Sequence, residues 1–247
     1  MKKILQLKSK TKKKVKAKKT NVDIWLTREN DYTRKAFENA SRYFDKNDVL
    51  TVNTLEALYG QESSFGILKR DRGMDGAAGH FHFQRDTAER YHLIVTKEND
   101  QRFDIDYSSI AAARYLDDLD RSFSKRTILS REIMTMPVKD ALERKKFIFA
   151  AYNGGEGIIA TAQRLAQEAK KDQTNWSDVQ EFLEQAGADD PDQVRKYVRD
   201  VSKNEIEFAK KSSADKTAKD NKINKSKGRC TRGHWVTIDD HPVFICD

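Results

Sequence analysis

The sequence is short of the residues that break helices. Only 3 prolines and 11 glycines occur among its 247 residues, and charged residues make up 35% of the chain. Proline and glycine are the residues least compatible with a helix interior, whereas Lys, Arg and Glu are good helix formers. We therefore expect a mainly α-helical domain with a very polar surface.

Apolar residues recur with the period of an α-helix in several segments. In residues 51–62, Leu55 and Leu58 fall on one face, and Glu62 ends the helix. Residues 69–82 are rich in small and turn-forming residues that interrupt this pattern, so we expect the binding cleft and a short β-like segment there. The segments with helical periodicity are 32–44, 51–62, 108–123, 140–152, 156–171, 177–186 and 191–208.

Charge is distributed unevenly along the chain. Residues 1–20 contain ten lysines and no acidic residue, and residues 210–247 carry a net charge of +4. Residues 21–209 therefore carry −6 of the overall +8. This pattern divides the chain into a basic disordered tail (1–20), a folded domain (21–209), a flexible basic linker (210–229) and a small C-terminal module (230–247).

The lysine tail has the charge to bind an anionic partner. Such a tail can attract an anionic wall polymer or an anionic membrane surface, although a solvated tail with no specific partner is the commoner case. No aromatic residue is interleaved among its lysines, so base stacking is absent and we expect no specific nucleic-acid binding. The lysines also interrupt the apolar run that a secretory signal peptide needs, and no stretch is long and apolar enough for a transmembrane helix.

Glu62 is the candidate catalytic residue. It is followed by two serines, Phe65 and Gly66, at the end of a predicted helix with Leu58 nearby. A carboxyl group that apolar neighbours shield from water keeps its proton and can donate it to a glycosidic oxygen. Taken alone, a glutamate at a helix end is more commonly an exposed cap or ion-pair partner.

The motifs that follow Glu62 in the sequence support its assignment as the catalytic residue. In order, they are Gly76-Ala-Ala-Gly79 with Gln84 and Thr87-Ala88, Ala112-Ala-Arg-Tyr115-Leu116, Ala150-Ala-Tyr152-Asn153-Gly154, and Tyr197-Val198 with Val201. Together with Glu62-Ser63-Ser-Phe65, this series resembles the lytic transglycosylase (SLT-like) and goose-type lysozyme family over residues 50–202. The resemblance implies a lysozyme-like helical domain in residues 21–209.

The resemblance implies roles for the matching residues. Glu62 would act first as the acid and then as the base. Ser63 would orient the Glu62 carboxylate or the acetamido group of the substrate. Tyr152 and Asn153 would line the cleft beside Glu62, and Tyr197 would close it from the last helix. No cofactor or metal ion is implied.

The glycine-rich motif has a further implied role in binding, and the residues around it depart from the family pattern in two places. The resemblance implies that Gly76, Ala77 and Gly79 let the backbone approach the sugar chain closely. The family usually has Gln where this chain has His82, which can still hydrogen bond to a sugar and titrates near neutral pH. Residues 69–75 also replace the usual serine-bearing loop.

Three functions remain open. The resemblance favours a peptidoglycan lytic transglycosylase, in which Glu62 alone cleaves the β-1,4 bond between N-acetylmuramic acid (MurNAc) and N-acetylglucosamine (GlcNAc) and gives a 1,6-anhydro-MurNAc product. A second carboxylate, for which Asp71 and Asp75 are the candidates, would instead activate water and make the enzyme a hydrolytic goose-type lysozyme. The third alternative is a virion structural protein that binds glycan without cleaving it.

The sequence of the C-terminal module predicts a small β-hairpin. Two β-rich runs flank Asp239 and Asp240, and the module weakly resembles tail segments of phage and prophage morphogenesis proteins. We therefore expect a virion-associated enzyme, or one delivered to the cell wall or periplasm by a phage-type route, with other virion proteins as possible partners of the hairpin. A disulfide or a zinc site are less favoured alternatives to a plain hairpin, and their candidate residues are Cys230, His234, His241 and Cys246.

Overall fold

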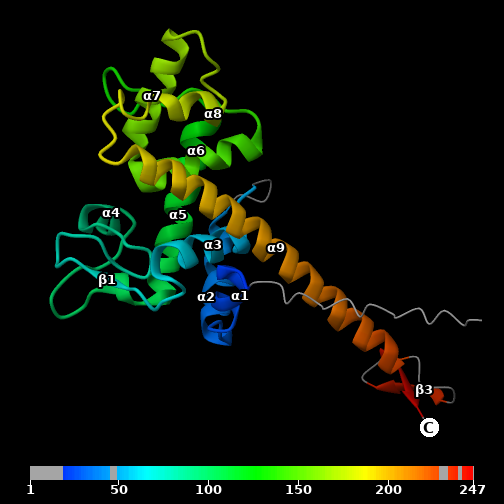
Figure 1. Cartoon of the computed structure of the whole chain (residues 1–247). Coiled ribbons are helices and arrows are strands. Elements are labelled where there is room, and N and C mark those ends of the chain that lie inside the picture. Colours follow the sequence, from blue (N-terminus) through cyan, green and yellow to red (C-terminus); the bar gives the residue numbers. More distant parts are fainter. Residues whose placement is uncertain (1–18, 45–48, 228–232, 239–240, 247) are drawn as a thin grey trace, which may run out of the picture.

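The computed structural model describes residues 19–44, 49–227, 233–238 and 241–246. The helices are α1 (Asn21–Leu26), α2 (Asp31–Ala40), α3 (Val52–Ser63), α4 (Arg85–Arg90), α5 (Ile105–Ser124), α6 (Ala141–Gly154), α7 (Glu156–Glu168), α8 (Trp176–Val179) and α9 (Pro191–Lys227), with 3₁₀ turns η1 (Ser41–Tyr43), η2 (Gln101–Phe103) and η3 (Gln180–Phe182). The prediction of a mainly α-helical, lysozyme-like domain is confirmed. In Figure 1, α1 to α3 and α6 to α8 form two groups, α5 lies between them, and α9 crosses both.

Local sequence signals set where the central helices begin. Asp104 caps α5 and accepts hydrogen bonds from the backbone N–H groups of Asp106 and Tyr107. Asp140 caps α6 in the same way through the N–H of Glu143, at 2.8 Å. A carboxylate at this position pairs backbone donors that a helix start leaves free. α5 therefore starts close to the predicted segment, and it packs against α2 and α6.

α9 joins the two groups of helices. It packs against α3 and α6, and the ion pair between Lys145 of α6 and Glu205 of α9, at 2.8 Å, is nearly buried. At the other end of the domain, Phe208 of α9 stacks on Trp25 of α1, with ring centroids 6.3 Å apart. Aromatic burial of this kind is a large part of a core's stability. α9 thereby places its first half, with Tyr197, across the end of α3.

A short two-stranded segment precedes α4. β1 (Arg70–Asp71) pairs antiparallel with β2 (Ala78–Gly79), and Ala78 also forms a bridge with Phe83. This is the β-like segment expected in residues 69–82. Its strands are too short to be stable alone, because isolated two-stranded ribbons are marginal in water. The segment therefore depends on side chains from elsewhere in the chain.

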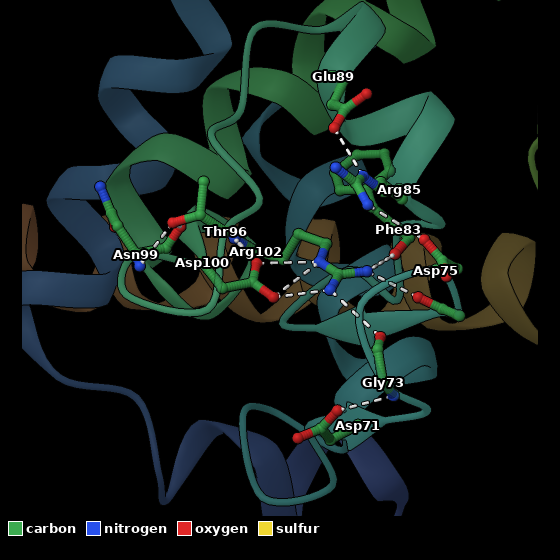
Figure 2. Close-up of polar contacts among 11 residues, drawn as sticks. Asp71, Gly73, Asp75, Phe83, Arg85, Glu89, Thr96, Asn99, Asp100 and Arg102 are labelled. Atoms are coloured by element: carbon green, nitrogen blue, oxygen red, sulfur yellow. Dashed lines mark hydrogen bonds and ion pairs between the residues drawn. The ribbon is translucent and has the colours of Figure 1, made fainter.

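Arg102 of η2 supplies that support (Figure 2). Its side chain is 1% exposed and forms a two-bond contact with the Asp100 carboxylate, with Nε–Oδ1 at 2.9 Å and Nη2–Oδ2 at 2.6 Å. The remaining guanidinium donors reach the carbonyl oxygens of Gly73, Gly76 and Phe83, at 3.4, 2.6 and 3.2 Å. A buried arginine whose donors are all used holds a loop in one conformation.

The structure differs from the predicted helix over residues 177–186. Only residues 177–179, which end α8, are α-helical there, and the chain continues as η3 and turns. Arg195 of α9 donates to the Gln180 carbonyl oxygen from Nε and Nη2, at 3.2 and 3.0 Å. In a continued α-helix that carbonyl would accept from residue 184. A long-range contact therefore competes with the local helical pattern.

The chain after the domain also differs from the prediction of a flexible linker over 210–229. α9 continues as a helix to Lys227, because this lysine-rich stretch has no proline or glycine before Gly228. Figure 1 shows this half of α9 projecting from the domain. β3 (Gly233–Ile238) and β4 (His241–Cys246) then pair antiparallel as a hairpin.

Residues 1–18 of the predicted lysine tail (1–20) and Cys230 lie outside the described residues. The predicted partners of the tail, and the disulfide or zinc site of the C-terminal module, therefore stay predictions. Among the described helices, none is long and apolar enough to cross a membrane.

Removing the Arg102 side chain tests its structural role. Arg102→Ala leaves Asp100 charged and the loop carbonyls without donors, so we expect a loss of roughly 3–5 kcal/mol in the free energy of unfolding, measured by chemical denaturation. Arg85, whose ion pairs with Asp75 and Glu89 are solvent-exposed, gives the matched control. Arg85→Ala should cost less than about 1 kcal/mol. Equal losses in the two variants would contradict the role given to Arg102.

Glu56 of α3 makes stability depend on pH. Its side chain is buried, and its Oε2 has no hydrogen-bond partner among the described residues. Burial, followed by the nearby Glu29 charge, raises the pKa of Glu56 from 4.5 to about 8, although Arg34 opposes the shift. Between these two values the folded protein binds more protons than the unfolded chain. The free energy of unfolding should therefore fall as pH rises through this range.

Replacing Glu56 by glutamine removes this dependence. Glu56→Gln should raise the free energy of unfolding by roughly 3 kcal/mol above about pH 8 and change it little near pH 4.5. Denaturation curves at both pH values measure the effect. Glu98→Gln, an exposed carboxylate far from α3, should leave the pH dependence unchanged. If the free energy of unfolding of Glu56→Gln depends on pH in the same way as that of the wild type, the buried, protonated carboxyl is refuted.

Candidate active site

Glu62 lies in the last turn of α3, just before a sharp bend. Ser64, Phe65 and Gly66 all have positive φ angles, of 49°, 61° and 82°. Positive φ strains a bulky residue such as Phe65 unless its surroundings hold it. The ring of Phe65 packs on Tyr59 in the core, with centroids 4.9 Å apart. This bend ends α3 immediately after Glu62.

Ser63 stabilises the bend from inside. Its side chain is fully buried, and its hydroxyl donates to the Tyr59 carbonyl oxygen and accepts from the Gly66 N–H, both at 3.0 Å. Both polar functions of the hydroxyl are therefore used by the backbone. Ser63 lines neither cavity beside Glu62, so the structure does not support the predicted contact with the substrate.

Two side chains from distant segments hold the carboxyl group of Glu62. The hydroxyl of Tyr197, on α9, donates to Oε1. Nδ1 of His82 lies 2.8 Å from Oε2. The Glu62 side chain is only 12% exposed and that of His82 10%. Each carboxyl oxygen thus has its own partner, and the group is fixed in one orientation.

His82 is itself fixed by the backbone. Its φ angle is 51°, a left-handed conformation that His adopts more readily than most residues. Its Nε2 lies 2.9 Å from the Leu68 carbonyl oxygen. Phe83, the next residue, accepts from both Arg102 and the Ala78 N–H. The loop held by Arg102 therefore carries His82 to Glu62.

Two cavities meet at Glu62. The larger has a volume of about 470 Å³ and the smaller about 250 Å³. Glu62, His82 and Asn153 line both, so the carboxyl group lies where a chain-like ligand would pass from one cavity to the other. Further residues lining the larger cavity include Arg72, Ala77, Phe83, Tyr115, Tyr152 and Asp189, and the smaller one is completed by Gln61, Gln193, Lys196 and Tyr197.

The tyrosines around Glu62 keep their protons. Burial, and next the Glu62 charge, raise the pKa values of Tyr152 and Tyr197 well above the usual range. Both hydroxyls therefore act as neutral donors at physiological pH. Tyr152 donates to the Phe81 carbonyl oxygen at 3.0 Å, which fixes its ring against the loop that carries His82.

Asn153 has a free acceptor in the same place. Its Oδ1 is buried and has no hydrogen-bond partner among the described residues. A buried acceptor without a partner is costly unless a ligand or water pairs it. Because Asn153 lines both cavities, its amide is suited to pair with a polar group of a ligand at the junction. Its predicted place beside Glu62 is where the structure puts it.

Gly79 lies beneath the site rather than in it. It has a φ of 81°, and a Cβ there would overlap the backbone of Arg102. The glycine is therefore needed for the loop to approach η2, and not for contact with a ligand. His80 next to it is also buried: its Nδ1 pairs with the Tyr59 hydroxyl at 3.1 Å. Burial lowers the pKa of His80 to about 4, so it is neutral.

The two loop aspartates do not reach Glu62. Asp71 accepts from the Gly73 N–H at 2.9 Å, and Asp75 pairs with Arg85 at 3.2 Å on the surface. Neither lines the cavities. Asp189, which the sequence analysis missed, does line the larger one. It precedes α9 in a run of exposed residues, and no local motif marks it. Among the described residues, no group of three or more His, Cys, Asp or Glu is placed to hold a metal ion.

A comparison with protein-family models identifies a known domain in the chain. The model described as the transglycosylase SLT domain matches residues 38–175, which is more than half of the chain. This span includes Glu62, His82 and Asn153, whereas Tyr197 lies beyond it. A search of the curated proteins found no match. The family cleaves glycosidic bonds in the glycan of peptidoglycan. With its helical fold and a carboxyl group at the junction of two cavities, the chain belongs to the transglycosylase SLT domain family.

Proposed function

We propose that this protein is a lytic transglycosylase in which Glu62 is the single acid and base. It cleaves the β-1,4 bond between MurNAc and GlcNAc and leaves a 1,6-anhydro-MurNAc end. The observation that carries this proposal is the position of Glu62: it is the one carboxylate among the residues that line both cavities. A glycan bound through both cavities would present a glycosidic oxygen to it.

The cavities have the side chains that sugars need. Phe83, Tyr115 and Tyr152 bring aromatic rings to the larger cavity, and rings suit the apolar C–H faces of a sugar. The amide of Asn153, which lines both cavities, offers a hydrogen-bond partner for a hydroxyl or acetamido group. Mixed apolar and polar lining of this kind fixes the orientation of a ligand.

One carboxyl group suffices for the reaction. Glu62 gives its proton to the glycosidic oxygen while the C1–O bond breaks, and the bonding electrons leave with that oxygen. The acetamido oxygen of the MurNAc ring stabilises the cationic C1. The C6 hydroxyl of the same ring then attacks C1, and its proton returns to Glu62. No water is consumed, and the enzyme ends in its starting protonation state.

The second candidate is hydrolysis, and one observation favours it. Asp189 brings a second carboxylate to the larger cavity, the place from which a base would activate water in a two-carboxylate mechanism. Asp189 belongs to the chain just before α9 and is exposed, so it is a weaker candidate than Glu62. The two mechanisms give different products, and product analysis separates them.

Mass spectrometry of the muropeptides released from purified peptidoglycan tests the proposal. The wild type should release anhydro-muropeptides, Glu62→Gln should release none, and Asp189→Asn should leave the product unchanged. Loss of Glu62 should lower the rate at least roughly a hundredfold, because general acid–base catalysis contributes that much.

Two other outcomes would contradict it. Reducing-end products that disappear in Asp189→Asn would establish the hydrolase. If neither the wild type nor Glu62→Gln releases products from acid to neutral pH, cleavage is refuted and a non-catalytic role is favoured.

Removing the Tyr197 hydroxyl tests how Glu62 is oriented. Tyr197→Phe deletes the donor to Oε1, so kcat should fall roughly 10- to 100-fold while KM changes little, because the contact is to the acid and not to the glycan. Steady-state kinetics on soluble glycan fragments measures both constants. Tyr107→Phe, an exposed tyrosine on α5, is the control and should match the wild type. A rise in KM alone would show that Tyr197 binds the glycan instead.

A further inference from the structure

The contacts of His82 determine which of its ring nitrogens carries a proton. Nε2 lies 2.9 Å from the Leu68 carbonyl oxygen. A carbonyl oxygen only accepts, so Nε2 must donate and must carry hydrogen. Nδ1 is the atom that faces Glu62 Oε2, at 2.8 Å. In neutral His82, Nδ1 is therefore an acceptor, and the proton in this contact must come from Glu62.

Tyr197 determines which oxygen of Glu62 holds that proton. Its neutral hydroxyl donates to Oε1, so Oε1 is an acceptor. The acidic proton of Glu62 must then sit on Oε2, between Oε2 and Nδ1 of His82. If the proton moves to Nδ1, the contact becomes an imidazolium–carboxylate pair. Both forms contain the same single proton.

We propose that His82 is a positioning residue that shares the catalytic proton with Glu62. This inference rests on the proposed function, since it gives the shared proton to the glycosidic oxygen. It also changes the role that the sequence suggests for His82: both ring nitrogens contact the protein, so the ring acts on Glu62 and not primarily on the sugar.

The pair accounts for the change of Glu62 from acid to base. When the shared proton passes to the glycosidic oxygen, the Nδ1 lone pair is left facing a carboxylate oxygen at close range. That repulsion makes the pair a stronger base at the moment when the C6 hydroxyl must lose its proton. The returning proton restores the contact, so protons balance over one turnover.

The other titratable groups that line the two cavities come from five segments. Charged residues that line the two cavities affect how tightly the proton is held: nearby cations favour its loss, and a nearby carboxylate favours its retention. The neutral tyrosines act as hydrogen-bond donors. These neighbours are Arg72 in the loop, Tyr115 on α5, Tyr152 on α6, Asp189 before α9, and Lys196 and Tyr197 on α9. None of these neighbours is substituted in the variants that test the proposal.

The test compares His82→Asn with the wild type over pH. Asparagine tolerates the left-handed conformation of residue 82 and presents its amide near the position of Nδ1, but it does not titrate. The plot of kcat against pH should be bell-shaped for the wild type. In His82→Asn the acid limb should disappear, because no second proton can enter the pair. The alkaline limb should also move to lower pH, because an amide, unlike the imidazole, cannot bind the shared proton as a base.

The size of the effect separates positioning from binding. His82→Asn should lower kcat roughly 10- to 100-fold at its optimum and leave KM within about threefold. His92→Asn is the matched control: His92 is exposed, has a φ of 66° and lies outside both cavities, so its profile should equal that of the wild type. An unchanged pH profile in His82→Asn, with cleavage intact, overturns the shared proton but leaves the proposed function standing. A wild type that releases no products overturns the proposed function.

Nitrogen-15 NMR of the histidine imidazoles tests the shared proton even if His82→Asn fails to fold. Near neutral pH, the folded wild type should show His82 with hydrogen on Nε2 and an Nδ1 shift between those of a free acceptor and a protonated nitrogen. Glu62→Gln should move that Nδ1 shift and leave His92 unchanged. If the Nδ1 chemical shift of His82 is the same in Glu62→Gln as in the wild type, the proposal is refuted.

Discussion

The buried guanidinium of Arg102 is the contact on which the cleft depends. It neutralises Asp100 and donates to three carbonyl oxygens of the loop between residues 73 and 83, a stretch with only two-residue strands of its own. Because that loop ends at Phe83, one residue after His82, the guanidinium also determines where the imidazole lies. The catalytic geometry is thus built on an ion pair that touches neither cavity.

The site is assembled from segments far apart in the chain. α3 supplies Glu62, the loop supplies His82, α6 supplies Asn153, and α9 supplies Tyr197, which is 135 residues from Glu62. α9 reaches α3 because Phe208 and Glu205 anchor it to α1 and α6. A carboxyl group enclosed by neutral tyrosines and one imidazole is shielded from water, which strengthens every polar contact that it makes. Packing of α9 therefore contributes to the chemistry as well as to the fold.

The sequence predicts the helices and the centre of the site, but not the parts that depend on distant contacts. Leu55 and Leu58 recur at helical spacing, so α3 follows from the apolar pattern alone. The place of Tyr152 and Asn153 beside Glu62 was expected only from the family resemblance of the Ala-Ala-Tyr-Asn motif. Nothing local marks Arg102 as buried or Asp189 as a cavity residue. Ser63 and Gly79 follow the motif, yet the structure uses them to build the bend and the loop. The predicted helix over residues 177–186 is wrong for the same reason, since Arg195 of α9 donates to the carbonyl oxygen of Gln180.

The central claim is that Glu62 meets a glycosidic bond at the junction of the two cavities. A crystal structure of Glu62→Gln with a MurNAc–GlcNAc tetrasaccharide tests it most directly. We expect sugar rings in both cavities, a glycosidic oxygen within hydrogen-bond distance of the residue 62 side chain, and a hydrogen bond between the Asn153 amide and the glycan. A tetrasaccharide bound elsewhere, or bound with no glycosidic oxygen near residue 62, would contradict it.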